Sequence, residues 1–241
     1  MKKFGCISPS VVQLPWDIAS ALPQDLGVAV VTLNVRNGRP GEHERALGIM
    51  RGASDVLIDE GCGALVAFGV PVSARRGLAA ERAALEELTA DRGAVPIASS
   101  LRASALGFLE MNVRRPLFVT QYAPDVNALL VEFYRDAGLE PAGAAGLGAR
   151  NAAEVNALSS EDFYDLARRA IRDYPSAEGI FLSARGNLLN VALKLEAETG
   201  LPVVDQVQAA VWWARSVLDV PPRKGAGRLL ASAAYSPVNA S

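Results

Sequence analysis

The chain has 241 residues, of which half are hydrophobic and 21% are charged, the composition of an ordinary globular protein. A formal net charge of -2 provides no basic field for nucleic acid and no polybasic segment for a membrane surface. The N-terminal apolar run is too short for a signal peptide, and no stretch reaches the length of a membrane span. We therefore expect neither a nucleic-acid partner nor a membrane partner.

Short apolar runs alternate with helical stretches along the whole chain, a pattern typical of βα units and parallel sheets. The expected strands are 3–7, 28–33, 64–68, 96–98, 116–120, 142–147, 179–183 and 202–205, of which 142–147 has the weakest pattern. Several are continuous apolar runs, as expected for strands covered by helices on both faces.

Helical spacing is clearest in four segments. The segment 42–60 places Leu47, Met50, Val56 and Leu57 along one stripe, and 125–138 is similarly amphipathic. Ser159 or Ser160 is a candidate N-cap for a helix that runs to residue 174. The segment 206–218 contains two tryptophans, which we interpret as packing residues. The tail from residue 221 has little pattern and is expected to be loosely ordered, with Leu229 and Leu230 as possible docking points.

An internal repeat defines the architecture. The segments 4–9, 63–69 and 95–100 parallel 117–122, 178–184 and 201–206 in the same order. We therefore predict an α/β fold of two pseudo-symmetric, Rossmann-like halves, each with about four parallel strands, and a cleft between them. The expected boundaries are 1–110 plus 205–220 for the first half, 111–204 for the second half and 221–241 for the tail.

In parallel sheets, ligands bind beyond the carboxyl ends of the strands. Two halves that face each other would bring four strand ends to one cleft. The site hypothesis consists of the residues at those ends: Pro9, Gly69, Val70, Pro71, Tyr122, Ser183, Ala184, Arg185 and Gly186.

These segments resemble arylmalonate decarboxylase and its relatives in the aspartate/glutamate racemase superfamily, which include maleate isomerase. The resemblance covers roughly residues 3–218 and rests on GCISPS at 5–10, FGVPVS at 68–73, TQYAPDVN at 120–127 and GIFLSARG at 179–186. The TQYAPDVN segment is the most specific match. The resemblance implies a cofactor-free reaction on a small carboxylic acid, with no metal and with a carbanion formed next to a carboxylate.

The resemblance places the superfamily's two cysteine positions at Gly69 and Ala184. A racemase uses both thiols, on opposite faces of the substrate, whereas a decarboxylase needs a single thiol to protonate an enediolate. Gly69 excludes two-thiol racemisation and disfavours maleate-isomerase chemistry. Ala184 can neither donate nor accept a proton. Two explanations stay open: an alanine introduced at the cysteine position, or a natural member that uses another acid or none.

The donors that would hold the developing negative charge are also changed. Val70 and Pro71 follow the glycine, and Pro71 has no backbone N–H. The N–H groups of Val70 and Val72, together with Ser73 and Tyr122, are the remaining candidates. Arg185 is a candidate for a second carboxylate.

Other chemistry-bearing residues are interpreted as structural. His43, the only histidine, has no visible partner and is expected at a solvent-facing helix start. Cys6 and Cys62 form no CxxC or His/Cys cluster, which suggests buried thiols, no disulfide framework and a reducing cytoplasm. The leading hypothesis is a decarboxylase of a malonate-type dicarboxylic acid, which is either active or inactivated by alanine at position 184. The alternatives are an isomerase or racemase-like enzyme with a rearranged acid–base pair, and a non-catalytic carboxylate-binding protein. The oligomeric state is left open.

Overall fold

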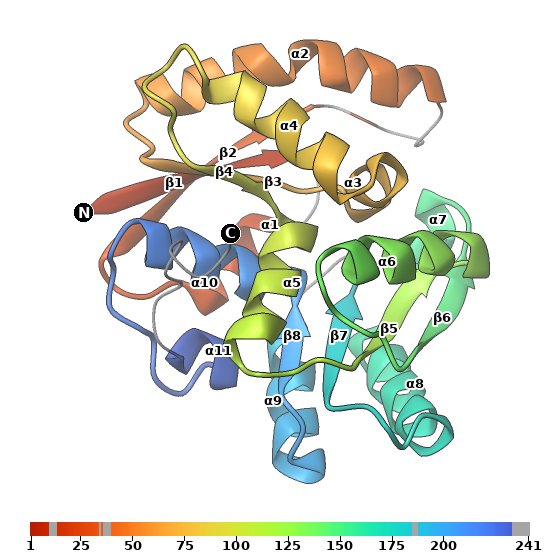
Figure 1. Ribbon diagram of the computed structural model, residues 1–241. Coiled ribbons are helices and arrows are strands. Elements are labelled where there is room, and N and C mark those ends of the chain that lie inside the picture. Colours follow the sequence, from red (N-terminus) through yellow and green to blue (C-terminus); the bar gives the residue numbers. More distant parts are fainter. Residues whose placement is uncertain (10–13, 34, 36–39, 185–187, 233–241) are drawn as a thin grey trace.

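Two parallel four-stranded sheets form the framework of the computed structural model (Figure 1), which describes residues 1–9, 14–33, 35, 40–184 and 188–232. The first sheet has the order β2-β1-β3-β4, and the second has the order β6-β5-β7-β8. The strands are β1 (Lys2–Ser8), β2 (Leu26–Thr32), β3 (Ala64–Ala67), β4 (Ile97–Ser99), β5 (Pro116–Tyr122), β6 (Gly143–Ala149), β7 (Gly179–Ser183) and β8 (Val203–Asp205). The identical strand orders confirm the predicted fold of two similar α/β halves.

Helices cover both faces of each sheet. They are α1 (Leu14–Ala21), α2 (Pro40–Asp59), α3 (Val70–Arg76), α4 (Leu78–Thr89), α5 (Ser100–Glu110), α6 (Pro124–Asp136), α7 (Ala152–Ala157), α8 (Ser160–Asp173), α9 (Leu189–Thr199), α10 (Gln206–Val217) and α11 (Arg228–Ala231). Helices α2 and α4 lie on the outer face of the first sheet, and α8 and α9 contact the second sheet (Figure 1). Helices α5 and α10 pack against each other and contact strands of both sheets. No helix in the described part of the chain is long and apolar enough to cross a membrane.

The core divides into a central layer and two outer layers because side chains alternate along each strand. In β1, Phe4 and Cys6 join the central cluster, whereas Ile7 joins the outer cluster under α2 and α4. In the second half, Phe118 and Phe181 enter the central cluster, and their rings meet edge-on with centroids 5.7 Å apart. The central layer therefore joins the two halves through continuous apolar packing.

Several expectations about local structure are confirmed. Ser159 caps α8, and its hydroxyl forms a capping box with Asp162. The two tryptophans, Trp212 and Trp213, are buried in the core. Both cysteines are buried and free.

Other expectations are wrong. Val56 is 54% exposed, because α2 turns the side of the helix with Ala53 and Leu57 toward the sheet. The tail is ordered at least to residue 232 rather than loosely ordered, whereas the expected docking of Leu229 and Leu230 is confirmed, since both are fully buried in the central cluster. The segment after Gly69, for which no helix was expected, is the helix α3. His43 lies in the first turn of α2, as expected for a helix start, and its side chain is outside the described part of the structure.

Candidate functional site

The end of β3 is shaped by Gly69, which is the N-cap of α3 and has φ 123° and ψ 59°. A side chain at this backbone conformation would be strained, so glycine is favoured here. The space itself is open, because a Cβ at this position would meet Pro9 Cγ only at 3.6 Å. Pro9 and Gly69 therefore lie next to each other at the carboxyl edge of the first sheet.

The end of β5 is held by a buried hydrogen-bond network. The Thr120 hydroxyl donates to the Asn127 side-chain oxygen at 2.7 Å and accepts the Tyr122 backbone N–H at 3.1 Å. The Asn127 amide donates in turn to the Tyr122 carbonyl at 3.4 Å. The register of β5 against β6 shifts between Thr120 and Tyr122, and a Cβ at Gly146 would lie 2.1 Å from the Tyr122 carbonyl oxygen. These contacts fix the backbone that carries the Tyr122 side chain.

The ends of β5 and β7 meet through their side chains. The Ser183 hydroxyl donates to the Tyr122 hydroxyl at 3.3 Å, and both residues are buried. Ala184 follows Ser183, is buried, and its carbonyl accepts a hydrogen bond from the Gln206 side chain at 2.8 Å. Arg185 and Gly186 lie outside the described residues.

Helix α3 brings the two strand edges toward each other. It follows β3 and contacts α6, the helix that follows β5. Val70 and Ala74 of α3 belong to the same buried apolar cluster as Tyr122. The described residues of the site hypothesis thus lie at the carboxyl ends of the two sheets, with Pro9, Gly69, Val70 and Pro71 in the first half and Tyr122, Ser183 and Ala184 in the second.

The first turn of α3 offers fewer N–H donors than the sequence suggested. The backbone N–H groups of Val72 and Ser73 both donate to the Gly69 carbonyl, at 2.9 and 3.1 Å. Pro71 has no N–H. The Val72 N–H is thus already used inside the helix, which corrects its assignment as a candidate donor. Val70 N–H, the Ser73 hydroxyl and the Tyr122 hydroxyl remain as candidates.

A cavity of about 230 Å³ opens beside Pro9 and Gly69 and extends between the first sheet and the outer helices. Apolar side chains make up most of its wall, and four polar residues contribute to it. The lining residues are Pro9, Leu33, Met50, Ala67, Phe68, Gly69, Val72, Ser73, Arg76, Glu81, Ala84, Leu85, Glu87 and Leu88. All of these residues come from the first half, whereas Tyr122, Ser183 and Ala184 belong to the second.

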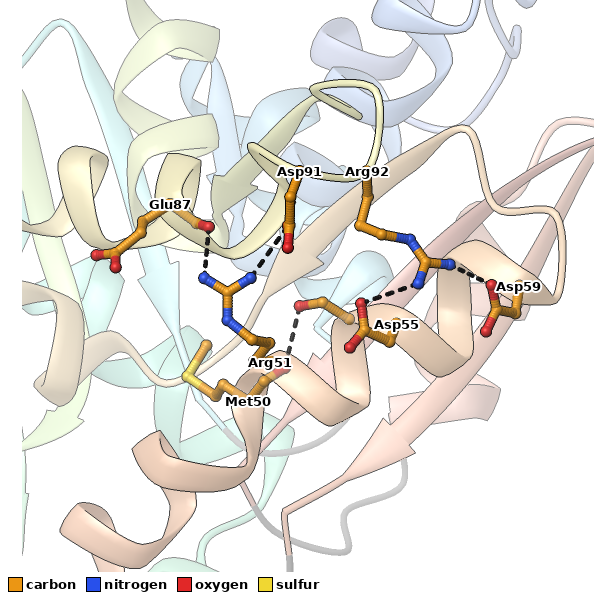
Figure 2. Close-up of polar contacts among 8 residues, drawn as sticks. Met50, Arg51, Asp55, Asp59, Glu87, Asp91 and Arg92 are labelled. Atoms are coloured by element: carbon orange, nitrogen blue, oxygen red, sulfur yellow. Dashed lines mark hydrogen bonds and ion pairs between the residues drawn. The ribbon is translucent and has the colours of Figure 1, made fainter.

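The two helices that wall the cavity are tied together at their solvent side (Figure 2). Arg51 of α2 pairs with Asp91 at 3.1 Å and donates to the Glu87 carbonyl at 2.9 Å. Arg92, beyond the end of α4, pairs with Asp55 and Asp59 of α2. Exposed ion pairs contribute about 1 kcal/mol or less each, so these contacts act mainly to set the spacing of α2 and α4.

Three polar residues of the cavity, Arg76, Glu81 and Glu87, were missed by the sequence interpretation. Arg76 is an exposed cation at the end of α3, and Glu81 is a buried acid in the first turn of α4. Glu81 occupies the helical stripe of Ala84, Leu85 and Leu88, which all line the cavity. An acid on an apolar stripe was the signal in the sequence that could have identified it.

Burial raises the pKa of the Glu81 carboxyl, because desolvation disfavours its charged form. The hydroxyl of Ser99 and the cations Arg102 and Arg76 oppose this shift without cancelling it. Neither carboxyl oxygen has a hydrogen-bond partner that meets normal geometry, and both are inaccessible to water. Among the described residues, no group of three or more His, Cys, Asp or Glu side chains is arranged to hold a metal ion.

Two similar halves, each with a parallel four-stranded sheet flanked by helices, define a fold of the aspartate/glutamate racemase superfamily. The arylmalonate decarboxylase family model matches residues 6–230, and the chain belongs to this family. It is 28% identical over 207 residues to the arylmalonate decarboxylase of Bordetella bronchiseptica, covering 86% of this chain and 85% of that protein.

Solved structures agree with this assignment. The crystal structure of arylmalonate decarboxylase is similar with a TM-score of 0.82 and 27% identity, covering 95% of this chain and 98% of the other. Maleate isomerase Iso from Pseudomonas putida S16 is similar with a TM-score of 0.86 and 22% identity, covering 97% and 99%. At this lower identity, the second likeness concerns the fold alone.

Proposed function

We propose that the protein is a cofactor-free decarboxylase of a malonate-type dicarboxylic acid with an apolar substituent on its central carbon. The main support is membership of the arylmalonate decarboxylase family, together with the apolar cavity beside Pro9 and Gly69. An engineered apolar cavity of about 150 Å³ binds benzene, so the 230 Å³ available here accommodates a ring-sized substituent.

In this proposal, the substituent lies along Met50, Leu85 and Leu88, and the two carboxylates lie at the strand ends. Loss of carbon dioxide leaves negative charge on the remaining carboxylate, which becomes an enediolate. The Tyr122 and Ser73 hydroxyls and the Val70 N–H are the donors assigned to that charge. The apolar wall disfavours the departing carboxylate and promotes its loss as neutral carbon dioxide.

Arg76 is assigned to the entrance of the cavity, where it attracts the dianionic substrate and pairs with one carboxylate. Arg185, the candidate from the sequence for a second carboxylate, lies outside the described residues and stays a candidate for the other carboxylate. An Arg76→Met variant is therefore expected to raise KM more than it lowers kcat, because the charge is used in binding.

The test is carbon dioxide release from phenylmalonate and methyl-phenylmalonate by the parent chain and by Ala184→Cys, measured side by side. The variant restores a thiol at the position where the resemblance places the family cysteine. Release by either protein supports the decarboxylase assignment. Release by neither, in folded protein, contradicts it for these acids and favours the non-catalytic carboxylate-binding alternative. Solvent-deuterium exchange at the central carbon without carbon dioxide release would instead favour a racemase-like isomerase.

A further inference from the structure

Glu81 is a buried acid in the first turn of α4 and contributes to the cavity wall. Its side chain is 3% exposed, and neither carboxyl oxygen forms a hydrogen bond within the described structure. Leaving such a group unpaired destabilises the fold by roughly 1–3 kcal/mol. Ser99, Arg102 and Arg76 favour the charged form of Glu81 without cancelling the cost of its burial, which points to a role outside folding.

The position of Glu81 along the cavity is set by chain topology. Helix α4 connects β3 to β4, which are parallel neighbours, so it runs back against the strand direction. Its first turn therefore lies at the carboxyl edge of the sheet, and its last turn lies at the opposite edge. Of the cavity-lining residues on α4, Glu81 is the one closest to the carboxyl edge, where Pro9 and Gly69 are found.

The surroundings of Glu81 keep its proton in place. Apolar wall residues desolvate it, and the charged groups that act on it are Arg76 of α3, Arg102 of α5 and Glu86 of its own helix. Arg102 also forms an ion pair with Glu86, with 4.0 Å between the guanidinium nitrogen and the carboxylate oxygen. The net result is a raised pKa, so the acid form is retained at a higher pH than in an exposed glutamate.

We propose that Glu81 is the proton donor of the decarboxylation, in place of the thiol that is missing at Gly69 and Ala184. This inference rests on the proposed function. The bond between the central carbon and the departing carboxylate breaks, and its electron pair enters the enediolate. The Glu81 O–H bond then breaks, and its proton forms the new C–H bond as the enediolate collapses to the carboxylate. Glu81 is left as a buried carboxylate, and it regains a proton from water that enters the cavity after the product leaves.

The proposal has a stereochemical consequence. Glu81 acts from the half that carries Gly69, whereas a thiol at residue 184 acts from the end of β7 in the opposite half. The two donors thus approach the central carbon from opposite faces. With methyl-phenylmalonate, the parent and an enzyme that relies on a cysteine at position 184 should give opposite enantiomers of the product.

The experiment compares four proteins: the parent, Glu81→Gln, Ala184→Cys and the double variant Glu81→Gln/Ala184→Cys. Carbon dioxide release and the enantiomer ratio are measured for each across a pH series. Removal of a general acid is expected to lower kcat by about 100-fold or more. We therefore expect a working parent, a Glu81→Gln variant reduced by that factor, and a double variant that is active and yields the opposite enantiomer.

The double variant also controls for folding, because its activity shows that the Glu81→Gln substitution leaves the pocket intact. Glu196→Gln is the matched control: Glu196 is also buried with a raised pKa, but it binds the Val203 and Arg228 N–H groups away from the cavity. Equal rates for parent and Glu81→Gln, or activity only in proteins that carry the Ala184→Cys substitution, would overturn the role of Glu81 while leaving the decarboxylase assignment intact. The absence of carbon dioxide release from all four proteins would contradict the proposed function itself.

Discussion

The hydroxyl of Ser183 donates to the hydroxyl of Tyr122 at 3.3 Å, and this contact joins the ends of two neighbouring strands of the second sheet. The tyrosine oxygen is thereby held at the edge where the site hypothesis places the substrate. Tyr122→Phe is expected to lower kcat/KM by about 10- to 100-fold, equivalent to about 1.4–2.7 kcal/mol of transition-state stabilisation. Steady-state kinetics on methyl-phenylmalonate measures this loss.

The matched control for this variant is Tyr164→Phe. The Tyr164 hydroxyl bonds to Glu198 at 2.8 Å on the outer side of the second half, away from the strand ends. Its loss should change the rate by less than about twofold. Equal effects of the two variants would show that Tyr122 acts through general stability rather than at the site.

The network behind Tyr122 predicts a stability effect. Thr120→Val keeps the shape of the side chain but leaves the Asn127 oxygen and the Tyr122 N–H without their buried partner. The free energy of unfolding should fall by about 1–3 kcal/mol. Denaturant unfolding provides the measurement, with Thr199→Val as control, because the Thr199 hydroxyl bonds only within and just after its own helix end. A Thr120→Val variant as stable as the parent would show that this network does not hold the backbone around Tyr122.

The fold was predictable from the sequence because its signals are local and repeated. Apolar runs between helical stretches indicate parallel strands, and the shared order of segments such as 4–9 and 117–122 indicates two equivalent halves. The carboxyl ends of those strands then indicate where ligands bind. That reasoning placed Pro9 and Gly69 at the carboxyl edge of the first sheet and Tyr122 at that of the second, without any knowledge of side-chain packing.

The acid Glu81 could not be placed in the same way. Its burial depends on how α4 packs against the sheet and α2, and this is decided by contacts between segments distant in the sequence. The same limit explains why the orientation of Val56 was predicted wrongly. The apolar stripe of α2 is wide enough for the helix to pack against the sheet in more than one rotation about its axis. It also explains Val72, whose N–H donates to the Gly69 carbonyl inside a helix that was not expected from the sequence.

Gly69 predicts a cost for any side chain at its position. Its φ of 123° strains other residues, although the Cβ itself has room beside Pro9 and Val72. Gly69→Ala should therefore lower the free energy of unfolding by about 1–3 kcal/mol through the backbone alone. Gly48→Ala is the matched control: Gly48 lies within helix α2 with open space around it, and alanine there should stabilise by about 0.5–1 kcal/mol. An unchanged free energy of unfolding in Gly69→Ala would contradict the strained conformation at the end of β3.

The raised pKa of Glu81 predicts how stability depends on pH. The folded state holds this proton more tightly than the unfolded state, whose carboxyl has an ordinary pKa near 4.5. The stabilising contribution of the neutral acid is complete below that value, and it is lost as the pH rises toward the folded-state pKa. Each unit by which burial raises the pKa corresponds to about 1.4 kcal/mol.

Glu81→Gln removes this dependence, because glutamine does not titrate. The variant should be close to the parent in stability at pH 4 and increasingly more stable than the parent as the pH rises. Chemical denaturation of both proteins between pH 4 and 8 isolates the Glu81 contribution, since all other titrating groups are common to the pair. A difference that stays constant across this range would mean that Glu81 titrates as an exposed carboxyl, and the acid form needed for proton donation would then not be maintained by burial.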